Sequence, residues 1–296
     1  MEKVKKKITS KKNYINYDYE KVYDKQMEDM NETLINEILK LKNKCLYATK
    51  EIDSGVIKEI EIYPEFSRAE LKSGIIKKEN KEAQKNLNDK NARKHLIRLV
   101  NNNFNDGDMW ITLTYSDENL PKSVEESLKN IKNYIRRVNY RREKQGLKKA
   151  KYIYITEYSD SNDCIRCHHH IVMDKGLSMD EVENIWKLGR RNNVRKLNID
   201  ENGLTGLANY LSKDPKGNKR WCSSRNLKKP KIRKNHYKFK RKKVQNMVKH
   251  RDTIKSEMEK TYPGYSFINT EVRFNEYNSM FYIYTTMRKR VGEKKE

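Results

Sequence analysis

Long apolar stretches are absent from this sequence. Hydrophobic residues make up 35% of its 296 residues and charged residues 36%, whereas a membrane-spanning helix needs about 20 consecutive apolar residues. The segment from Met1 to Lys12 is basic, and no apolar segment follows it, so we expect no secretion signal either. These two absences argue against membrane insertion and predict a cytoplasmic protein.

Cysteine is scarce as well. Four cysteines are few for a chain of this length, which favours a reducing compartment over a disulfide framework. The pattern Gly-x-x-x-x-Gly-Lys-Ser/Thr does not occur, so a P-loop ATPase is excluded. No internal repeat is visible, so the chain is not a repeat array. The cysteines are Cys45, Cys164, Cys167 and Cys222.

Positive charge is abundant. Lys and Arg number 66 against 41 Asp and Glu, a formal net charge of +25. An excess of this size favours a polyanionic partner, and without a membrane segment that partner is nucleic acid.

The excess is strongest in residues 219–250, which contain fourteen Lys or Arg and no Asp or Glu. Trp221, Tyr237 and Phe239 are interleaved there, a pattern suited to phosphate contacts and base stacking. The alternative is a solvated segment that binds nothing specific. The candidate nucleic-acid-binding residues are Arg220, Trp221, Arg225, Lys228, Lys229, Lys231, Arg233 and Lys234.

Residue patterns predict an α+β fold built on an antiparallel sheet flanked by helices, with helical and hairpin extensions. Strands are expected at 109–115, 152–157 and 168–173, with a further strand at 194–199. Helices are expected at 67–100 (with a break near 86–91), 123–144, 179–188 and 203–212, and hairpins at 45–63 and 267–287. We expect three regions: a basic N-terminal arm or helix (1–42), a main domain (43–228), and a basic helix with a C-terminal hairpin (229–296) that completes the same domain or stands apart.

Three of the six histidines are consecutive, at the start of an apolar run. Side chains alternate faces on a strand, so His168 and His170 should point one way and His169 the other. Glu157 ends the preceding strand, and a loop of about ten residues would bring it beside them. Two imidazoles and a carboxylate suit Mg²⁺ or Mn²⁺. The alternative is a polar patch on a solvated strand.

Cys164, Cys167 and His168 have the spacing of a c-type haem attachment site, but that chemistry belongs to exported proteins. The two cysteines and His169 would also suit a zinc knuckle, which would need Cys222 or His236 as a fourth ligand. Two ordinary cysteines in a hairpin loop is the interpretation that we favour.

Tyr210 and Lys213 are three residues apart on a short expected helix, so their side chains should be neighbours. A tyrosine hydroxyl is a weak nucleophile at neutral pH. A metal that polarises a phosphate and a lysine that stabilises developing charge would make its attack feasible. With 19 tyrosines in the chain, this pair carries meaning only together with the histidine strand.

Taken in order, these parts resemble the HUH endonucleases, and among them the rolling-circle replication initiator (Rep) proteins of phages and plasmids. The strand from Trp110 to Tyr115 is similar to the family's first motif. His168-His169-His170 fits His-hydrophobe-His, except that the middle residue is histidine. Tyr210-Leu211-Ser212-Lys213 fits Tyr-x-x-Lys, with no second tyrosine at four-residue spacing, as in the single-tyrosine class. The resemblance covers roughly residues 105–225.

The resemblance implies a ferredoxin-like, RRM-like antiparallel sheet with the two histidines on its central strand and a bound divalent metal, with Glu157 as third ligand. Tyr210 would attack single-stranded DNA at an origin, form a 5′-phosphotyrosine link and free a 3′-OH for a polymerase. A second transesterification would rejoin the strand. No nucleotide cofactor is needed, and a host helicase would unwind the duplex.

Two alternatives remain open at this point. A conjugative relaxase or a transposase would use the same chemistry. A non-catalytic, zinc-stabilised nucleic-acid-binding protein would instead use Cys164, Cys167 and a histidine.

Overall fold

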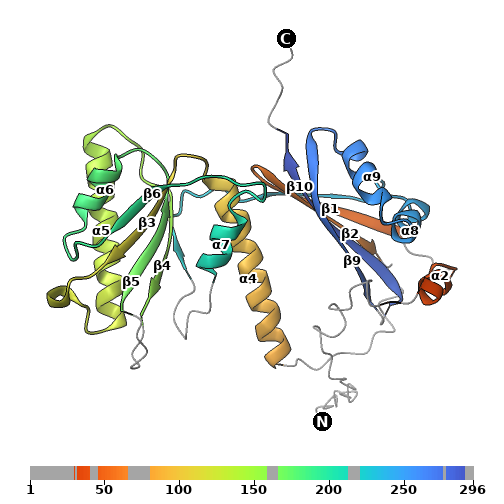
Figure 1. The fold of residues 1–296 in the computed structure, drawn as a ribbon, viewed down its shortest axis with the longest axis horizontal. Coiled ribbons are helices and arrows are strands. Elements are labelled where there is room, and N and C mark those ends of the chain that lie inside the picture. Colours follow the sequence, from red (N-terminus) through yellow and green to blue (C-terminus); the bar gives the residue numbers. More distant parts are fainter. Residues whose placement is uncertain are drawn as a thin grey trace, which may run out of the picture.

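The structure is a computed structural model that describes residues 30, 32–40, 46–65, 81–158, 166–212, 221–275 and 278–290. Two five-stranded antiparallel sheets lie on either side of a long central helix (Figure 1). The α+β class and the antiparallel pairing are confirmed, but there are two sheets where the sequence led us to expect one. We call them the histidine sheet and the hairpin sheet.

The histidine sheet contains the expected central strands. Its order is β6-β3-β5-β4-β7, and β5 lies between β3 and β4. Their antiparallel register places Thr114 and Glu157 on either side of His168, and Thr112 and Ile155 on either side of His170. Its strands are β3 (Met109–Thr114), β4 (Tyr152–Glu157), β5 (His168–Met173), β6 (Asn193–Lys196) and β7 (Cys222–Ser223).

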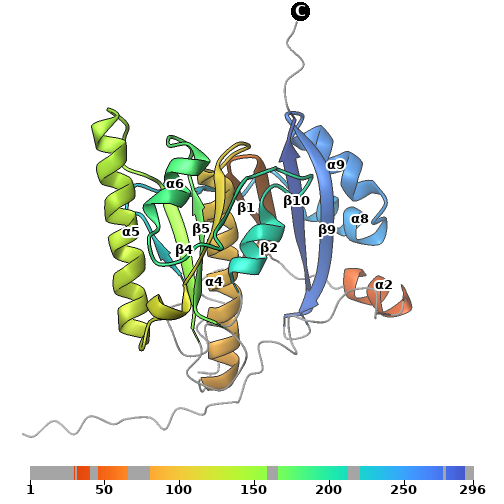
Figure 2. The ribbon, with the colours of Figure 1, turned by 60° about the vertical axis from the view of Figure 1, so that its left-hand side comes forward.

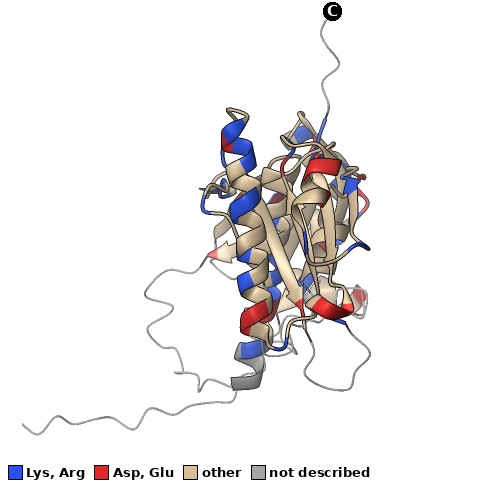
Figure 3. Ribbon diagram, turned by 90° about the vertical axis from the view of Figure 1, so that its left-hand side faces the viewer, with Lys and Arg blue, Asp and Glu red and all other residues tan. Residues whose placement is uncertain are grey.

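One face of the histidine sheet is covered by α5 (Val124–Lys144) and α6 (Met179–Ile185). Ser123 caps α5 by accepting a hydrogen bond from the backbone of Glu126, and Ser178 begins α6 in a capping box. Figure 3 views this side and shows Lys and Arg at intervals along α5, whose apolar stripe faces the sheet. The buried stripe residues are Ile131, Tyr134, Ile135 and Val138.

The other face is covered by α4 (Lys81–Asn103) and α7 (Thr205–Leu211), which pack against each other (Figure 2). The helix α4 is continuous, so the break expected near 86–91 is wrong. Residues 66–80 of the expected helix lie outside the described part. Leu96, Leu99 and Val100 of α4 form one apolar cluster with Ile153 and Val172 of the sheet. The core beneath α7 is therefore continuous with that of the sheet.

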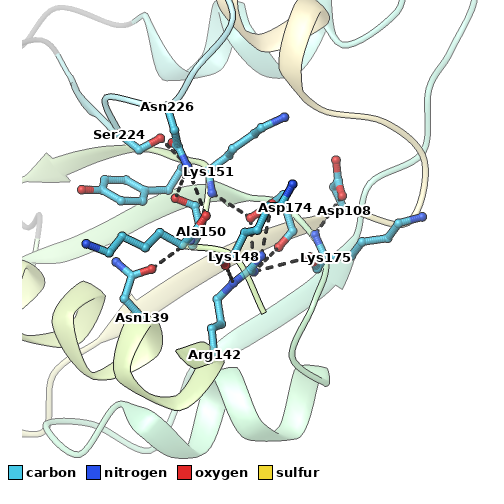
Figure 4. Close-up of polar contacts among 12 residues, drawn as sticks. Asp108, Asn139, Arg142, Lys148, Ala150, Lys151, Asp174, Lys175, Ser224 and Asn226 are labelled. Atoms are coloured by element: carbon cyan, nitrogen blue, oxygen red, sulfur yellow. Dashed lines mark hydrogen bonds and ion pairs between the residues drawn. The ribbon is translucent and has the colours of Figure 1, made fainter. Parts of the chain in front are cut away.

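A buried arginine fastens the sheet at the end away from the histidines (Figure 4). Arg142 of α5 donates to the backbone oxygens of Lys148 and Asp174 and pairs with the Asp174 carboxylate at 3.2 Å. Asp174 in turn accepts from the backbone N–H of Lys151, at 2.8 Å. Because a buried charge left without partners is costly, this network holds α5, β4 and β5 in one arrangement.

The hairpin sheet has the order β8-β1-β2-β10-β9. The two terminal hairpins pair with each other through β2 and β10, so they do not extend the histidine sheet. The N-terminal hairpin thus shares a sheet with residues that lie beyond the boundary expected at 228, and the division into domains stays a prediction. Its strands are β1 (Leu46–Ser54), β2 (Ile57–Glu65), β8 (Lys231–Asn235), β9 (Tyr265–Asn275) and β10 (Met280–Lys289).

Three helices contribute to the apolar core on one face of the hairpin sheet: α2 (Glu32–Lys40), α8 (Arg241–Lys249) and α9 (Thr253–Thr261). The opposite face meets α4, where Arg98 donates to the carboxylate of Glu59 at 2.9 Å and also pairs with Glu61. Gly55, in the β1–β2 turn at φ +75°, touches α4 as well, because a Cβ there would lie 2.6 Å from the Asn101 oxygen. One helix thus contacts both sheets.

None of the helices described here is both long and apolar enough to cross a lipid bilayer.

Candidate active site

Glu157, His168 and His170 meet at one end of the histidine sheet, as the sequence predicts. His168 Nε2 lies 3.4 Å from Glu157 Oε2, and His170 Nε2 lies 3.7 Å from Glu157 Oε1. One ligand atom from each residue lies within 4.8 Å of the other two. No other three His, Cys, Asp or Glu side chains in the described ranges form such a group.

Hydrogen bonds orient both imidazoles toward this point. His168 Nδ1 lies 2.8 Å from the Arg166 carbonyl oxygen. A carbonyl oxygen only accepts, so Nδ1 carries the hydrogen and Nε2 keeps its lone pair. His170 Nδ1 lies 3.1 Å from Thr112 Oγ1, and the hydroxyl accepts from it in the same tautomer. A second partner of this kind is the usual way in which proteins hold a metal-binding histidine.

The donor set fits a divalent cation. The two Nε2 atoms are 3.1 Å apart, so in these tautomers their lone pairs converge. Glu157 Oε1 is buried and accepts no hydrogen bond from the described residues. A buried acceptor without a donor calls for an explanation, and an ion is one. Two imidazole nitrogens and a carboxylate are ligands that Mn²⁺ and Mg²⁺ accept.

Tyr210 points its hydroxyl at this group. Its OH lies 3.2 Å from His170 Nε2, while the side chain as a whole remains 37% exposed. The helix α7 presents it there because Ala208 and Leu211, on the helix's other side, are buried in the core. Partial burial and then the charge of Glu157 raise the pKa of Tyr210 above its ordinary value. The side chain is therefore a neutral phenol at neutral pH.

Trp110 and Thr112 complete the site, and sequence reasoning missed both. Trp110 stacks on His170 with ring centroids 5.0 Å apart and an interplanar angle of 17°, and it meets Tyr210 edge-on at 5.9 Å. Both residues lie on β3, the strand that pairs with the histidine strand. The signal was present, because alternation along an adjacent strand puts Trp110 and Thr112 on one face.

His169 faces the opposite side of the sheet, as predicted. It is fully buried, and its ring nitrogens lie 2.9 Å from Thr156 Oγ1 and 2.8 Å from the Tyr115 hydroxyl. Burial, and next the charges of His168 and His170, lower its pKa to about 3. It is a neutral, hydrogen-bonded core residue and takes no part in the ion site.

The cysteines give no support to a zinc or haem site. Cys167 is buried in the core beneath α5, and burial raises the pKa of its thiol to about 12, whereas zinc binds the thiolate. Cys164 lies outside the described residues. His236, a proposed fourth ligand, instead pairs with Glu65 on the hairpin sheet at 2.6 Å. Among the described residues, the zinc knuckle therefore has no ligand set.

The comparison with protein families adds an independent observation. Residues 108–215 match the family model of the replication-associated protein ORF2. The matched segment runs from just before β3 to just after α7, so it spans Glu157, His168, His170 and Tyr210. It covers a little over a third of the chain. No curated protein and no solved structure matches.

The remaining expected residues are placed less directly. Lys213 and Arg220 lie outside the described part of the chain, so the pairing of Tyr210 with Lys213 stays a prediction. Trp221 is half-buried against the core between α4 and the sheet. The other candidates for nucleic-acid binding are exposed, between the two sheets or on β8, except that Lys228 also holds Asn103 through its backbone: Arg225, Lys228, Lys229, Lys231, Arg233 and Lys234.

The basic segment differs from our expectation in one aromatic residue. Tyr237 is 86% exposed, but Phe239 is only 1% exposed, in the core of the hairpin sheet with Val244 and Met247 of α8. Phe239 is therefore not free to stack on a base, and that expectation is wrong. The charges around it are the solvent-facing side of a folded element, which the composition alone did not distinguish from an open binding segment.

Proposed function

We propose that this protein is a rolling-circle replication initiator that nicks single-stranded DNA with Tyr210 as nucleophile. The observation that carries the proposal is the meeting of a tyrosine hydroxyl with a carboxylate and two imidazoles, its OH 3.2 Å from His170 Nε2. The match of residues 108–215 to the replication-associated protein family supports it. The charge of +25 supports a nucleic-acid substrate.

Glu157, His168 and His170 would hold the divalent ion, Mg²⁺ or Mn²⁺. When bound, that ion supplies Lewis-acid polarisation of the scissile phosphate. The chain's own groups do the positioning: Thr112 and the Arg166 carbonyl orient the imidazoles. Trp110 fixes the His170 ring by stacking and limits Tyr210 from the side. Tyr210 then needs little movement to reach a phosphate held at the ligand group.

The reaction is a balanced transesterification. Tyr210 Oη forms a bond to phosphorus and loses its proton, and the bond from phosphorus to the 3′-oxygen of the upstream nucleotide breaks. That oxygen takes up a proton and becomes the free 3′-OH, while the 5′-phosphate remains linked to Tyr210. Attack by a 3′-OH on the phosphotyrosine reverses these steps and rejoins the strand. One phosphodiester is exchanged for another, so no nucleotide cofactor is required.

Lys213 would lie one helical turn from Tyr210 and stabilise charge on the phosphate. The partners of the proposed function are origin single-stranded DNA, a host helicase for unwinding and a polymerase for extension. A relaxase or a transposase would share the nicking step and differ in its DNA site. No contact of the described residues favours the zinc-stabilised alternative.

The test is the covalent adduct. The protein is incubated with circular single-stranded DNA and Mn²⁺ and analysed on a denaturing gel. The wild type should form a protein–DNA adduct, and Tyr210→Phe should form none while still binding DNA. Tyr237→Phe, which removes the same hydroxyl from an exposed site on the hairpin-sheet side, is the matched control and should form the adduct normally. An adduct with Tyr210→Phe would overturn the role of Tyr210.

A further inference from the structure

A second basic surface borders the histidine sheet, on the edge strand β6 and the loop before it. Between Asn184 and Ile199 the sequence contains no acidic residue and five basic ones. All five are exposed, and none makes an ion pair with another described residue. They are Lys187, Arg190, Arg191, Arg195 and Lys196. We call this group the β6 edge.

The β6 edge is fixed at the same end of the sheet as the histidines. Thr114, which pairs with His168, donates through its hydroxyl to the Arg191 carbonyl at 2.8 Å. Its own carbonyl accepts from Trp186 Nε1 at 2.6 Å. The loop passes so close that a Cβ on Gly189 would overlap that same carbonyl oxygen. The backbone of Arg191 is thus held beside the strand end that carries the ion ligands.

The edge also shares the face of the site. Asn193 pairs with Thr112, which pairs with His170 on its other side. Paired residues in an antiparallel sheet point to the same face. Asn193 and, two residues on, Arg195 therefore lie on the His170 face, where Arg195 Nε donates to Asn193 Oδ1 at 2.7 Å. A polyanion lying across that face would meet these groups next to the ligand group.

The nearby acids do not cancel this charge. Asp117 and Glu118 follow Ser116, whose backbone N–H donates to Leu188 O at 2.8 Å. Asp117 pairs with Arg166 at 2.5 Å, so Glu118 alone remains against the five cations of the edge. The local balance is positive at the point where a substrate would leave the site.

The previously expected basic segment begins at the other end of the sheet. Ser224 donates to Tyr152 O, and Lys228 donates to Asn103 at the end of α4. Tyr152 pairs with Met173, at the opposite end of β5 from His168. Five residues at about 3.3 Å each separate those ends, roughly 17 Å. Figure 4 shows Ser224 and Asn226 there, beside Asp174.

We infer that Arg190, Arg191 and Arg195 of the β6 edge bind the phosphates of single-stranded DNA next to the phosphate that is cut. The inference rests on the proposed function for the identity of the substrate. Arginine suits the role because its planar group donates to two phosphate oxygens at once. The edge would then set how the strand lies across the sheet, and α5, on the far face, would take no part.

The test measures binding of a fluorescent single-stranded oligonucleotide by anisotropy over a range of salt concentrations. Each phosphate contact on single-stranded DNA contributes about 0.7 to the slope of log K against log salt. Arg190→Gln/Arg191→Gln should lower that slope by about 1.4 and weaken binding roughly 25-fold at about 0.1 M salt. Arg136→Gln/Arg137→Gln removes the same charge from exposed positions on α5 and should leave the slope unchanged.

An unchanged slope for the edge variant, or an equal loss for the α5 variant, would overturn the inference. If Arg190→Gln/Arg191→Gln does not fold, Lys187→Gln/Arg195→Gln is measured against the same control. Adduct formation separates this inference from the proposed function. At saturating DNA the edge variant should reach the wild-type adduct yield, because Tyr210 and the ion ligands are intact. A wild type that forms no adduct, while the slopes still differ, would refute the nicking function and retain the binding edge.

Discussion

The Nε2 atoms of His168 and His170 lie 3.1 Å apart, with the Glu157 carboxylate within 3.7 Å of both. Alternation on β5 puts the two rings side by side on one face, and their Nδ1 partners turn both Nε2 atoms inward. Two imidazoles held this close without an ion leave converging lone pairs. The arrangement is therefore one that a cation stabilises, and the stabilisation can be measured.

Manganese should stabilise the wild type against unfolding. A ligand that binds only the folded state adds about 2.7 kcal/mol at a concentration 100 times its dissociation constant. His168→Ala and His170→Ala should lose this increment, measured as the shift in thermal midpoint with added MnCl₂. His236→Ala is the control, since that histidine pairs with Glu65 on the hairpin sheet, and it should keep the full shift. An equal shift in all four proteins would refute the ion site.

Thr112 should matter for manganese affinity although it does not touch the ion. Its hydroxyl lies 3.1 Å from His170 Nδ1, and loss of such a partner commonly costs 10- to 100-fold in metal affinity. Thr112→Val should therefore weaken manganese binding by about that factor in a calorimetric titration. Thr156→Val removes an equivalent hydroxyl 2.9 Å from His169 on the opposite face and should leave the affinity within about threefold. Equal losses would mean that general strain in β5, and not orientation of His170, sets the affinity.

Stability of the hairpin sheet should fall in acid because of Glu51. Burial alone would raise its pKa, but hydrogen bonds from Lys238 and Tyr262 and the charges of Lys238 and Lys58 bring it below the ordinary value of 4.5. A carboxylate with a lowered folded pKa contributes stability above its unfolded pKa and loses it as pH falls through the folded one. The loss should therefore begin near pH 4.5 and grow below it.

Urea unfolding at several pH values between about 7 and 3 tests this. Glu51→Gln should be less stable than the wild type at neutral pH, and the difference should shrink on acidification. Glu118→Gln, at an exposed turn, should follow the wild-type curve throughout. A constant difference between Glu51→Gln and the wild type at all pH values would contradict the assignment.

The parts of this fold that the sequence predicted are those set by local alternation. The strand from Tyr152 to Glu157 was predicted with its observed bounds, and the opposite orientations of His169 and its neighbours followed from the period of a strand. Ser123 and Ser178, before their helices, marked the starts of α5 and α6. Local patterns thus sufficed to bring Glu157 to the histidines.

The hairpin sheet was not predictable in this way because its pairing is long-range. Ile60 pairs with Thr285 across more than two hundred residues, and nothing in either hairpin specifies the other. The strand β8, Lys231–Asn235, is too charged to resemble a strand. It forms because Arg233 lies opposite Glu51, and Lys231 opposite Asp53, on β1, where opposite charges stabilise the pair. Phe239 was misassigned for the same reason, since its burial depends on that distant sheet.

Gly189 should be the glycine least tolerant of substitution near the site. An added Cβ would overlap the Thr114 carbonyl oxygen, a backbone atom that cannot move without displacing the strand paired with His168. Gly189→Ala should therefore destabilise the protein by about 1–3 kcal/mol, as overpacking commonly does. It should also weaken manganese binding, because Thr114 and His168 share one register.

Gly206 of α7 provides the matched substitution. A Cβ there meets no atom within 4 Å, and alanine is a better helix former than glycine by roughly 0.5–1 kcal/mol. Gly206→Ala should therefore leave stability unchanged or raise it slightly in urea unfolding. If Gly189→Ala were as stable as Gly206→Ala and bound manganese normally, the loop would not be held against β3. The placement of Arg190 and Arg191 beside the site would then lose its structural basis.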